Sequence, residues 1–235
     1  MSTPTISTSA SPEKYGRAFW ERLWRTAGIQ ATGLLLVAAL LYGRPPGAGA
    51  SADALVAFYG VNHMRILMTI PLLGVAVLNL SWFAAALRAS LANTGQDGWG
   101  AAATIAGSIV GSMFLLLGTV VASIVFSAVE GGNAATPTLN DLGWACLVLT
   151  SFPRAMLIMA GSFGLWRAGL ISGKVFAVGV GCIVLTLLGG TTWRPSGFWA
   201  PDGAYSLWIS PIIGLLWVLA ASRVLLKAPA APSGW

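Results

Sequence analysis

Six long apolar stretches dominate the sequence and restrict its fold more than any other feature. They cover roughly residues 27–43, 64–87, 100–128, 143–166, 175–192 and 206–226. A helix needs about 20 apolar residues to cross the hydrocarbon core of a bilayer. Backbone groups in lipid must be hydrogen-bonded within their own segment, so stretches of this kind fold as helices. The sequence therefore predicts an all-α protein: a polytopic integral membrane bundle of six transmembrane helices.

The composition excludes several classes of water-soluble protein. Hydrophobic residues make up 56% of the chain and charged residues only 9%, whereas soluble domains carry about 25% charged residues. This excludes a soluble enzyme, a disordered chain, a disulfide scaffold and a secreted domain. We expect a multi-pass protein of the cell membrane, with the lipid bilayer as its surroundings and no nucleic-acid partner.

The basic residues predict the orientation in the membrane. If the N-terminus is cytoplasmic, Arg44 and Arg194 are the only basic residues in the outer loops. Lysine and arginine are enriched in cytoplasmic loops, so both termini are predicted to be cytoplasmic. Two further arginines, Arg65 and Arg154, fall inside predicted spans. Nine basic residues then lie on the inner side: Lys14, Arg17, Arg22, Arg25, Arg88, Arg167, Lys174, Arg223 and Lys227.

The chain divides into four predicted segments. Residues 1–11 are rich in serine and threonine and predict a disordered tail. Residues 12–26 predict an interfacial amphipathic helix that starts at Ser11-Pro12-Glu13, a capping serine followed by proline and an acid. The transmembrane domain is predicted over 27–227 and a C-terminal tail over 228–235. A second interpretation, a cleaved signal peptide ending near Ala48-Gly49-Ala50, is left open.

Polar residues inside the even-numbered spans predict a ligand site. Pro71, Pro153 and Pro211 lie at similar depths in these spans, and each frees a backbone carbonyl one turn earlier. An arginine inside the membrane costs a few kcal/mol and is unlikely to face lipid. We therefore expect an outward-facing vestibule between the second, fourth and sixth spans, covered by the loop from Trp193 to Trp208. The candidate ligand-binding residues are Arg154, Arg65, His63, Asn79, Trp144, Trp193, Trp199 and Trp208.

Three of these assignments have structural alternatives. Arg154 can instead bond to freed carbonyls or pair with Asp141 or Glu130. A polar stripe from Asn62 through Arg65 and Thr69 to Asn79 predicts one helical face, but Arg65 is close enough to the surface to reach it. His63 also suits an interfacial position.

The third span has a face of small residues that includes Gly107 and Gly111. Such spacing allows two helices to approach closely. We favour a contact within the chain, with an oligomer or partner subunit on this face as the alternative.

Three functions follow from these features. The first is binding, of a transport type, of a hydrophobic or amphiphilic small molecule with an anionic or carbonyl head. The second is an intramembrane enzyme acting on a lipid or isoprenoid, in a terpene-cyclase-like reaction, with Glu130, Asp141 or Asp202 as a catalytic acid at the rim. The third is an accessory subunit of a larger membrane complex. No metal-binding or cofactor-binding motif is present in the sequence, so no metal and no cofactor is expected.

Overall fold

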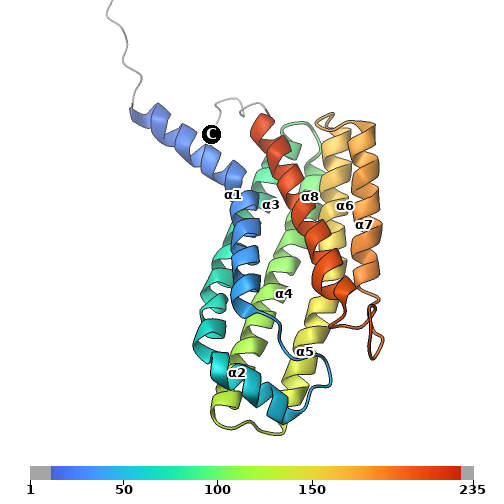
Figure 1. Cartoon of the computed structure of the whole chain (residues 1–235). Helices are drawn as coiled ribbons and strands as arrows, with labels where there is room; N and C mark the ends of the chain where they lie inside the picture. The colour runs from blue at the N-terminus through green and yellow to red at the C-terminus, as the bar shows by residue number, and fades with distance from the viewer. Residues whose placement is uncertain (1–11, 229–235) are drawn as a thin grey trace, which may run out of the picture.

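The computed structural model describes residues 12–228, with side chains from residue 23 onward (Figure 1). Within that part of the chain the regular structure is helical and contains no strand. The predicted tail 1–11, and residues 229–235 of the predicted C-terminal tail, lie outside the described residues. The helices are α1 (Pro12–Tyr42), α2 (Ala52–Leu67), α3 (Thr69–Ala92), α4 (Asp97–Val129), α5 (Ala135–Leu149), α6 (Ser151–Arg167), α7 (Gly173–Gly189), η1 (Tyr205–Ile209) and α8 (Ser210–Lys227).

The helices confirm the predicted fold class, a helical membrane bundle. Five segments are long and apolar enough to cross a bilayer: Leu23–Tyr42, Thr69–Ala92, Asp97–Val129, Ala135–Arg167 and Tyr205–Lys227. The sixth, α7, is apolar but has only 17 residues. At 1.5 Å per residue it is about 25 Å long, a little less than the hydrocarbon core.

Helix α1 begins at Pro12, the residue predicted to start a helix, and continues unbroken to Tyr42. The interfacial helix predicted over 12–26 and the first predicted span are therefore parts of a single helix. It ends at Gly43, whose φ of 77° is a left-handed conformation that glycine adopts without strain.

The three membrane prolines lie just after interruptions of their helices. Met68 separates α2 from α3, which contains Pro71, and Thr150 separates α5 from α6, which contains Pro153. Pro211 lies in the first turn of α8, directly after the π-helical segment η1. Proline cannot donate to the preceding turn, so the regular hydrogen-bond ladder stops at these points. The three prolines thus mark helix boundaries.

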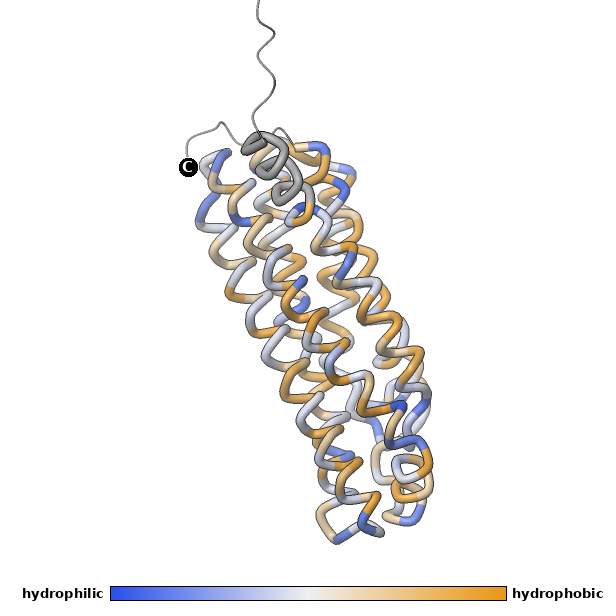
Figure 2. Tube along the Cα trace, turned by 90° about the vertical axis from the view of Figure 1, so that its left-hand side faces the viewer, coloured by the Kyte–Doolittle hydropathy of each residue, from blue (hydrophilic) through white to orange (hydrophobic). Residues whose placement is uncertain are grey.

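Charge is distributed unequally between the two ends of the bundle. We call the end with Arg25, Arg88, Arg167, Lys174, Arg223 and Lys227 the basic end. The other end, with the connections 43–51, 130–134 and 190–204, is called the loop end. Figure 2 shows hydrophilic positions gathered toward both ends of a largely apolar bundle. The orientation predicted from the sequence depends on this concentration of basic residues at one end.

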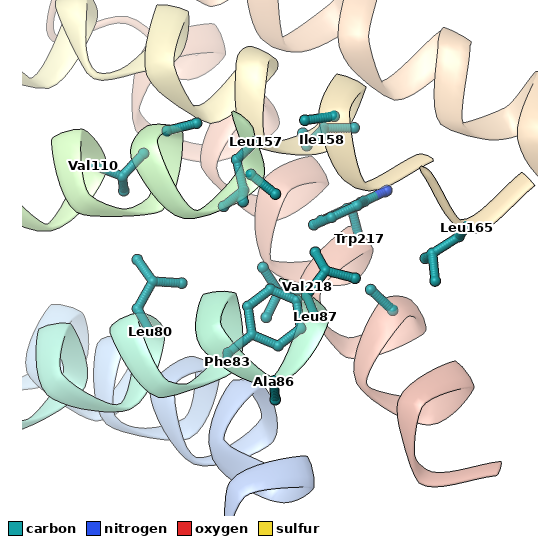
Figure 3. Packing of buried hydrophobic residues seen from close by; sticks show 14 of the residues in the cluster. Leu80, Phe83, Ala86, Leu87, Val110, Leu157, Ile158, Leu165, Trp217 and Val218 are labelled. Carbon is teal, nitrogen blue, oxygen red and sulfur yellow. The ribbon is translucent and has the colours of Figure 1, made fainter. Parts of the chain in front are cut away.

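Two separate hydrophobic cores hold the helices together. The basic-end core joins α1, α3, α4, α6, α7 and α8, and includes Leu80, Phe83, Leu157 and Trp217 (Figure 3). The loop-end core joins α2 to the last turns of α4, around Tyr59 and Ile124 among others.

The small-residue face of α4 packs within the chain, as favoured from the sequence. A side chain at Gly107 would meet Ala84 of α3 at 3.0 Å, and one at Gly111 would meet Val77 at 2.9 Å. Glycine at these positions allows α3 and α4 to approach closely.

Candidate functional site

A cavity of about 610 Å³ lies between the two cores. Its walls come from α1 and the loop after it, α2 at Tyr59, α3, α4, α5, α6, η1 and α8, and they are almost entirely apolar. Leu80, Val110, Leu157, Ile158, Trp217 and Val218 belong both to the cavity wall and to the basic-end core. The predicted vestibule used only the second, fourth and sixth spans. In the structure α1 and α4 also form part of the cavity wall. The polar lining expected from the sequence consists of only a few side chains.

The cavity opens sideways between α1 and α8. The exposed residues of its wall lie on the second half of α1 and the loop after it, and on η1 and α8. Leu40 is 80% exposed and Trp208 is 59% exposed. Figure 1 shows α1 and α8 diverging toward the loop end. This opening lies along apolar helix surfaces, so in a membrane it faces the hydrocarbon.

At the basic end α1 and α8 are joined tightly. Arg25 Nη1 donates to the backbone oxygens of Leu225, at 3.2 Å, and Ala228, at 2.6 Å. Gly28 packs directly against Ser222 and Val218. The two helices therefore form a V that is closed at the basic end.

The loop of residues 43–51 covers the loop end of the cavity. Gly43, Arg44 and Pro45 are part of the wall. Helix α5 holds this loop through three hydrogen bonds: Asn140 Nδ2 to Gly47 O at 2.9 Å, Trp144 Nε1 to Pro46 O at 3.1 Å, and Gly49 N to Asp141 Oδ1 at 2.7 Å. The predicted cover, the loop from Trp193 to Trp208, contributes only Leu207 and Trp208 to the wall. Sequence reasoning assigned the cover to the wrong connection, because an aromatic-rich loop at the interface does not show on which side of the bundle it folds.

Arg154 is the one basic side chain in the membrane-spanning part of the wall. It is 9% exposed, and its Nη2 donates to Ser151 Oγ at 2.9 Å and Ser210 Oγ at 3.3 Å. Its Nε donates to the carbonyl of Thr150 at 3.3 Å. Within the described residues Nη1 makes no hydrogen bond and no carboxylate lies within ion-pair distance. The carbonyl of Thr150 also accepts from Arg154 N, so it is not the carbonyl freed by Pro153, which is that of Leu149. Pairing with Asp141 or Glu130 is not found among the described residues either.

Arg154 belongs to a polar seam between α6, α7 and α8. Ser151 and Ser210 lie 3.5 Å apart, and Thr192 and Ser206 share a hydrogen bond of 2.7 Å. Gly189 of α7 packs against both Ser151 and Ser210, with no room for a side chain. The seam fixes two sides of the guanidinium, and Arg154 as a residue lines the cavity.

The structure brings together three of the eight predicted ligand-binding residues. Arg154, Trp144 and Trp208 line the cavity. The other five do not line it, and each has another environment. Arg65 is exposed beside Gly43, and the Nδ1 of His63 lies 2.7 Å from Gly60 O. Asn79 Nδ2 donates to Val75 O. Trp193 donates to Gly190 O, and Trp199 donates to Thr191 O.

The three predicted rim acids also lie outside the cavity. Glu130 and Asp141 are exposed, and Asp141 instead holds the 43–51 loop. The Asp202 carboxylate lies against Gly47 on the other side of that loop. None of the described acidic residues is part of the cavity wall.

Several wall residues escaped sequence reasoning. Tyr42 and Tyr59 share a hydrogen bond of 2.8 Å at the loop end of the cavity, and Asn140 and Ser210 position other parts of the site. Ser151 precedes Arg154 by three residues, a spacing that places two side chains on one helical face and was available as a signal. Ser210 and Asn140 are far from Arg154 in sequence, and nothing local connects them.

Comparison with models of known families, with curated proteins and with solved structures finds no match to this chain.

Proposed function

We propose that this membrane protein binds one amphiphilic molecule within the bilayer, as the binding step of transport. The apolar part of the molecule occupies the cavity and its polar head meets Arg154. The observation that carries the proposal is the guanidinium of Arg154, which lies at a largely apolar cavity with Nη1 unpaired within the described residues. A charge at such a position costs several kcal/mol unless it is matched, and a ligand head supplies the match.

The enclosure also supports the proposal. Ligand pockets have volumes of about 300–1,000 Å³ and combine apolar walls with a few polar groups, and this cavity has both properties. An opening toward lipid and a loop held across one end suit a molecule that partitions into the membrane. The enzyme alternative needs an acid near its substrate, and among the described residues no acid lies in the cavity wall. The cavity therefore favours binding over catalysis.

Native mass spectrometry of the full chain in mild detergent tests the proposal. We expect one retained non-bilayer molecule per chain, with occupancy reduced at least tenfold in Arg154→Gln. Arg88→Gln is the matched control, since Arg88 is exposed and paired with Asp97 at 3.1 Å; its occupancy should be unchanged.

A second pair of variants distinguishes loss of binding because the cavity is filled by a side chain from loss of binding because the protein is unfolded. Leu215 lines the cavity, whereas its neighbour Leu216 is 60% exposed and does not. Leu215→Trp should exclude the ligand, and Leu216→Trp should retain it, with both proteins eluting as folded species. Equal retention in the two tryptophan variants would refute the proposed cavity site.

A further inference from the structure

We infer that the ligand is a lipid with one hydrocarbon chain and an anionic head, taken from the bilayer between α1 and α8. The inference rests on the proposed function and specifies its ligand. Three observations support it: the charge state of the site, the dimensions of the cavity and the position of its opening.

The charge of the site selects an anion. Arg154 is more than nine-tenths buried and is held by two hydroxyl groups and a carbonyl, all of them neutral. These partners fix the guanidinium without compensating its charge. Hydrogen bonds from a guanidinium to a carboxylate or phosphate are about twice as strong as those between neutral groups. A carboxylate or phosphate head therefore gains more at this position than an alcohol, ester or amide head.

The cavity dimensions select a single chain. Along α4 the wall extends from Val110 to Ile124, about 20 Å at 1.5 Å per residue. One leaflet of hydrocarbon is about 15 Å thick, half of the bilayer core, so an acyl-length chain and its head fit lengthwise. A cavity of 610 Å³ is within the range of about 300–1,000 Å³ found for pockets that hold one small-molecule ligand. It therefore suits one chain better than two.

The opening selects the bilayer as the source. Leu36, Leu40 and Ile212 lie at its edges and are all substantially exposed. An anion arriving from water would have to pass these side chains or displace the hydrogen-bonded 43–51 loop. A single-chain lipid already has its tail among such side chains. The geometry therefore favours lateral entry over entry from solution.

Binding of palmitate and methyl palmitate to the delipidated full chain tests the head, because the two probes share one tail. We expect native mass spectra to show palmitate bound at least tenfold more tightly than its methyl ester. In Arg154→Gln the preference for palmitate over its methyl ester should disappear. The variant should bind palmitate more weakly and the methyl ester as tightly as before. Arg88→Gln should keep the full preference.

Two further probes test the source and the number of chains. Radiolabelled inorganic phosphate, followed by equilibrium dialysis, should not bind at millimolar concentration, and dioleoyl phosphatidic acid should bind at least tenfold more weakly than palmitate. Binding of free phosphate that is lost in Arg154→Gln would assign the site to a soluble anion. Equal affinity for the two-chain lipid would overturn the single-chain assignment.

The outcomes separate this inference from the proposed function. If acid and ester bind equally and Leu215→Trp excludes both, the cavity binds amphiphiles but does not select anions. If neither probe binds to folded protein, both the proposed function and the inferred ligand class are wrong.

Discussion

Trp144 shows how one side chain can serve both a cavity wall and its cover. Its ring is 6% exposed and lines the cavity, while its Nε1 donates to Pro46 in the covering loop. Trp193 has a similar hydrogen bond, to Gly190 O at 2.9 Å, but it lies within one connection and is 52% exposed. The two tryptophans thus differ in whether their hydrogen bond links distant parts of the chain.

Trp144→Phe is expected to loosen the covering loop while keeping the wall. The substitution retains an aromatic ring and removes one hydrogen bond worth about 1 kcal/mol. The amides of Gly49 and Ala50 should exchange with deuterium about fivefold faster, as measured by hydrogen-exchange mass spectrometry. In Trp193→Phe these amides should exchange at the original rate. Equal acceleration in both variants would show that Trp144 does not hold the loop.

The contact between α1 and α8 depends on a glycine. A side chain at Gly28 would meet Ser222 Oγ and would lie 2.7 Å from the ring of Phe83. Such contacts are too short for real Cβ atoms, so one of the helices has to move. Gly33, on the same helix, has open space around it.

Gly28→Ala should therefore destabilise the bundle and Gly33→Ala should not. Overpacking of this kind costs about 1–3 kcal/mol, whereas the gain in helix propensity is similar for both variants. Unfolding in detergent with increasing dodecyl sulfate, followed by circular dichroism, measures the difference. A Gly28→Ala protein as stable as Gly33→Ala would mean that α1 and α8 do not pack this closely.

At the level of elements, the positions of the helices could be predicted from the sequence more accurately than which side of each helix faces the cavity. Long apolar stretches are sufficient to place helices, because lipid requires internal hydrogen bonding. The stripe from Asn62 to Asn79 was read as one helical face, but the break at Met68 divides it. Arg65 lies before this break and is not part of the cavity wall, whereas Arg154 lies after the corresponding break and lines the cavity. A proline signals an interruption, but not how the following helix is rotated.

The enclosure itself could not be predicted from periodicity. Each membrane helix carries apolar residues on every side, so hydrophobicity does not distinguish a lipid face from a cavity face. The participation of α1 and α4 in the wall depends on contacts between elements distant in sequence. Arg154 was identifiable because a charge in an apolar stretch is conspicuous by itself.

For the whole molecule, the uneven distribution of charge predicts its orientation. Six basic residues with described side chains lie at the basic end, against Arg44, Arg65 and Arg194 toward the loop end. Cytoplasmic loops are enriched in such residues. We expect the basic end to face the cytoplasm and the covering loop to face outward.

Single cysteines on a cysteine-free background test this orientation. Cys146 and Cys182 would be replaced by alanine, and a reporter placed at exposed Thr94, at the basic end, or exposed Ser196, at the loop end. A membrane-impermeant maleimide should label Ser196→Cys in intact cells, and Thr94→Cys only after lysis. The reverse pattern would place the covering loop in the cytoplasm.

The V formed by α1 and α8 also has a consequence for biosynthesis. The hydrogen bond from Arg25 to Leu225 spans 200 residues of sequence, so its acceptor is synthesised long after its donor. Ser210, a partner of Arg154, likewise arrives 56 residues after the arginine. A nascent chain that has inserted its first five spans thus contains Arg154 without its hydrogen bond to Ser210. The cavity of that chain lacks the wall formed by α8 and is open to lipid on that side. Completion of the cavity coincides with insertion of α8.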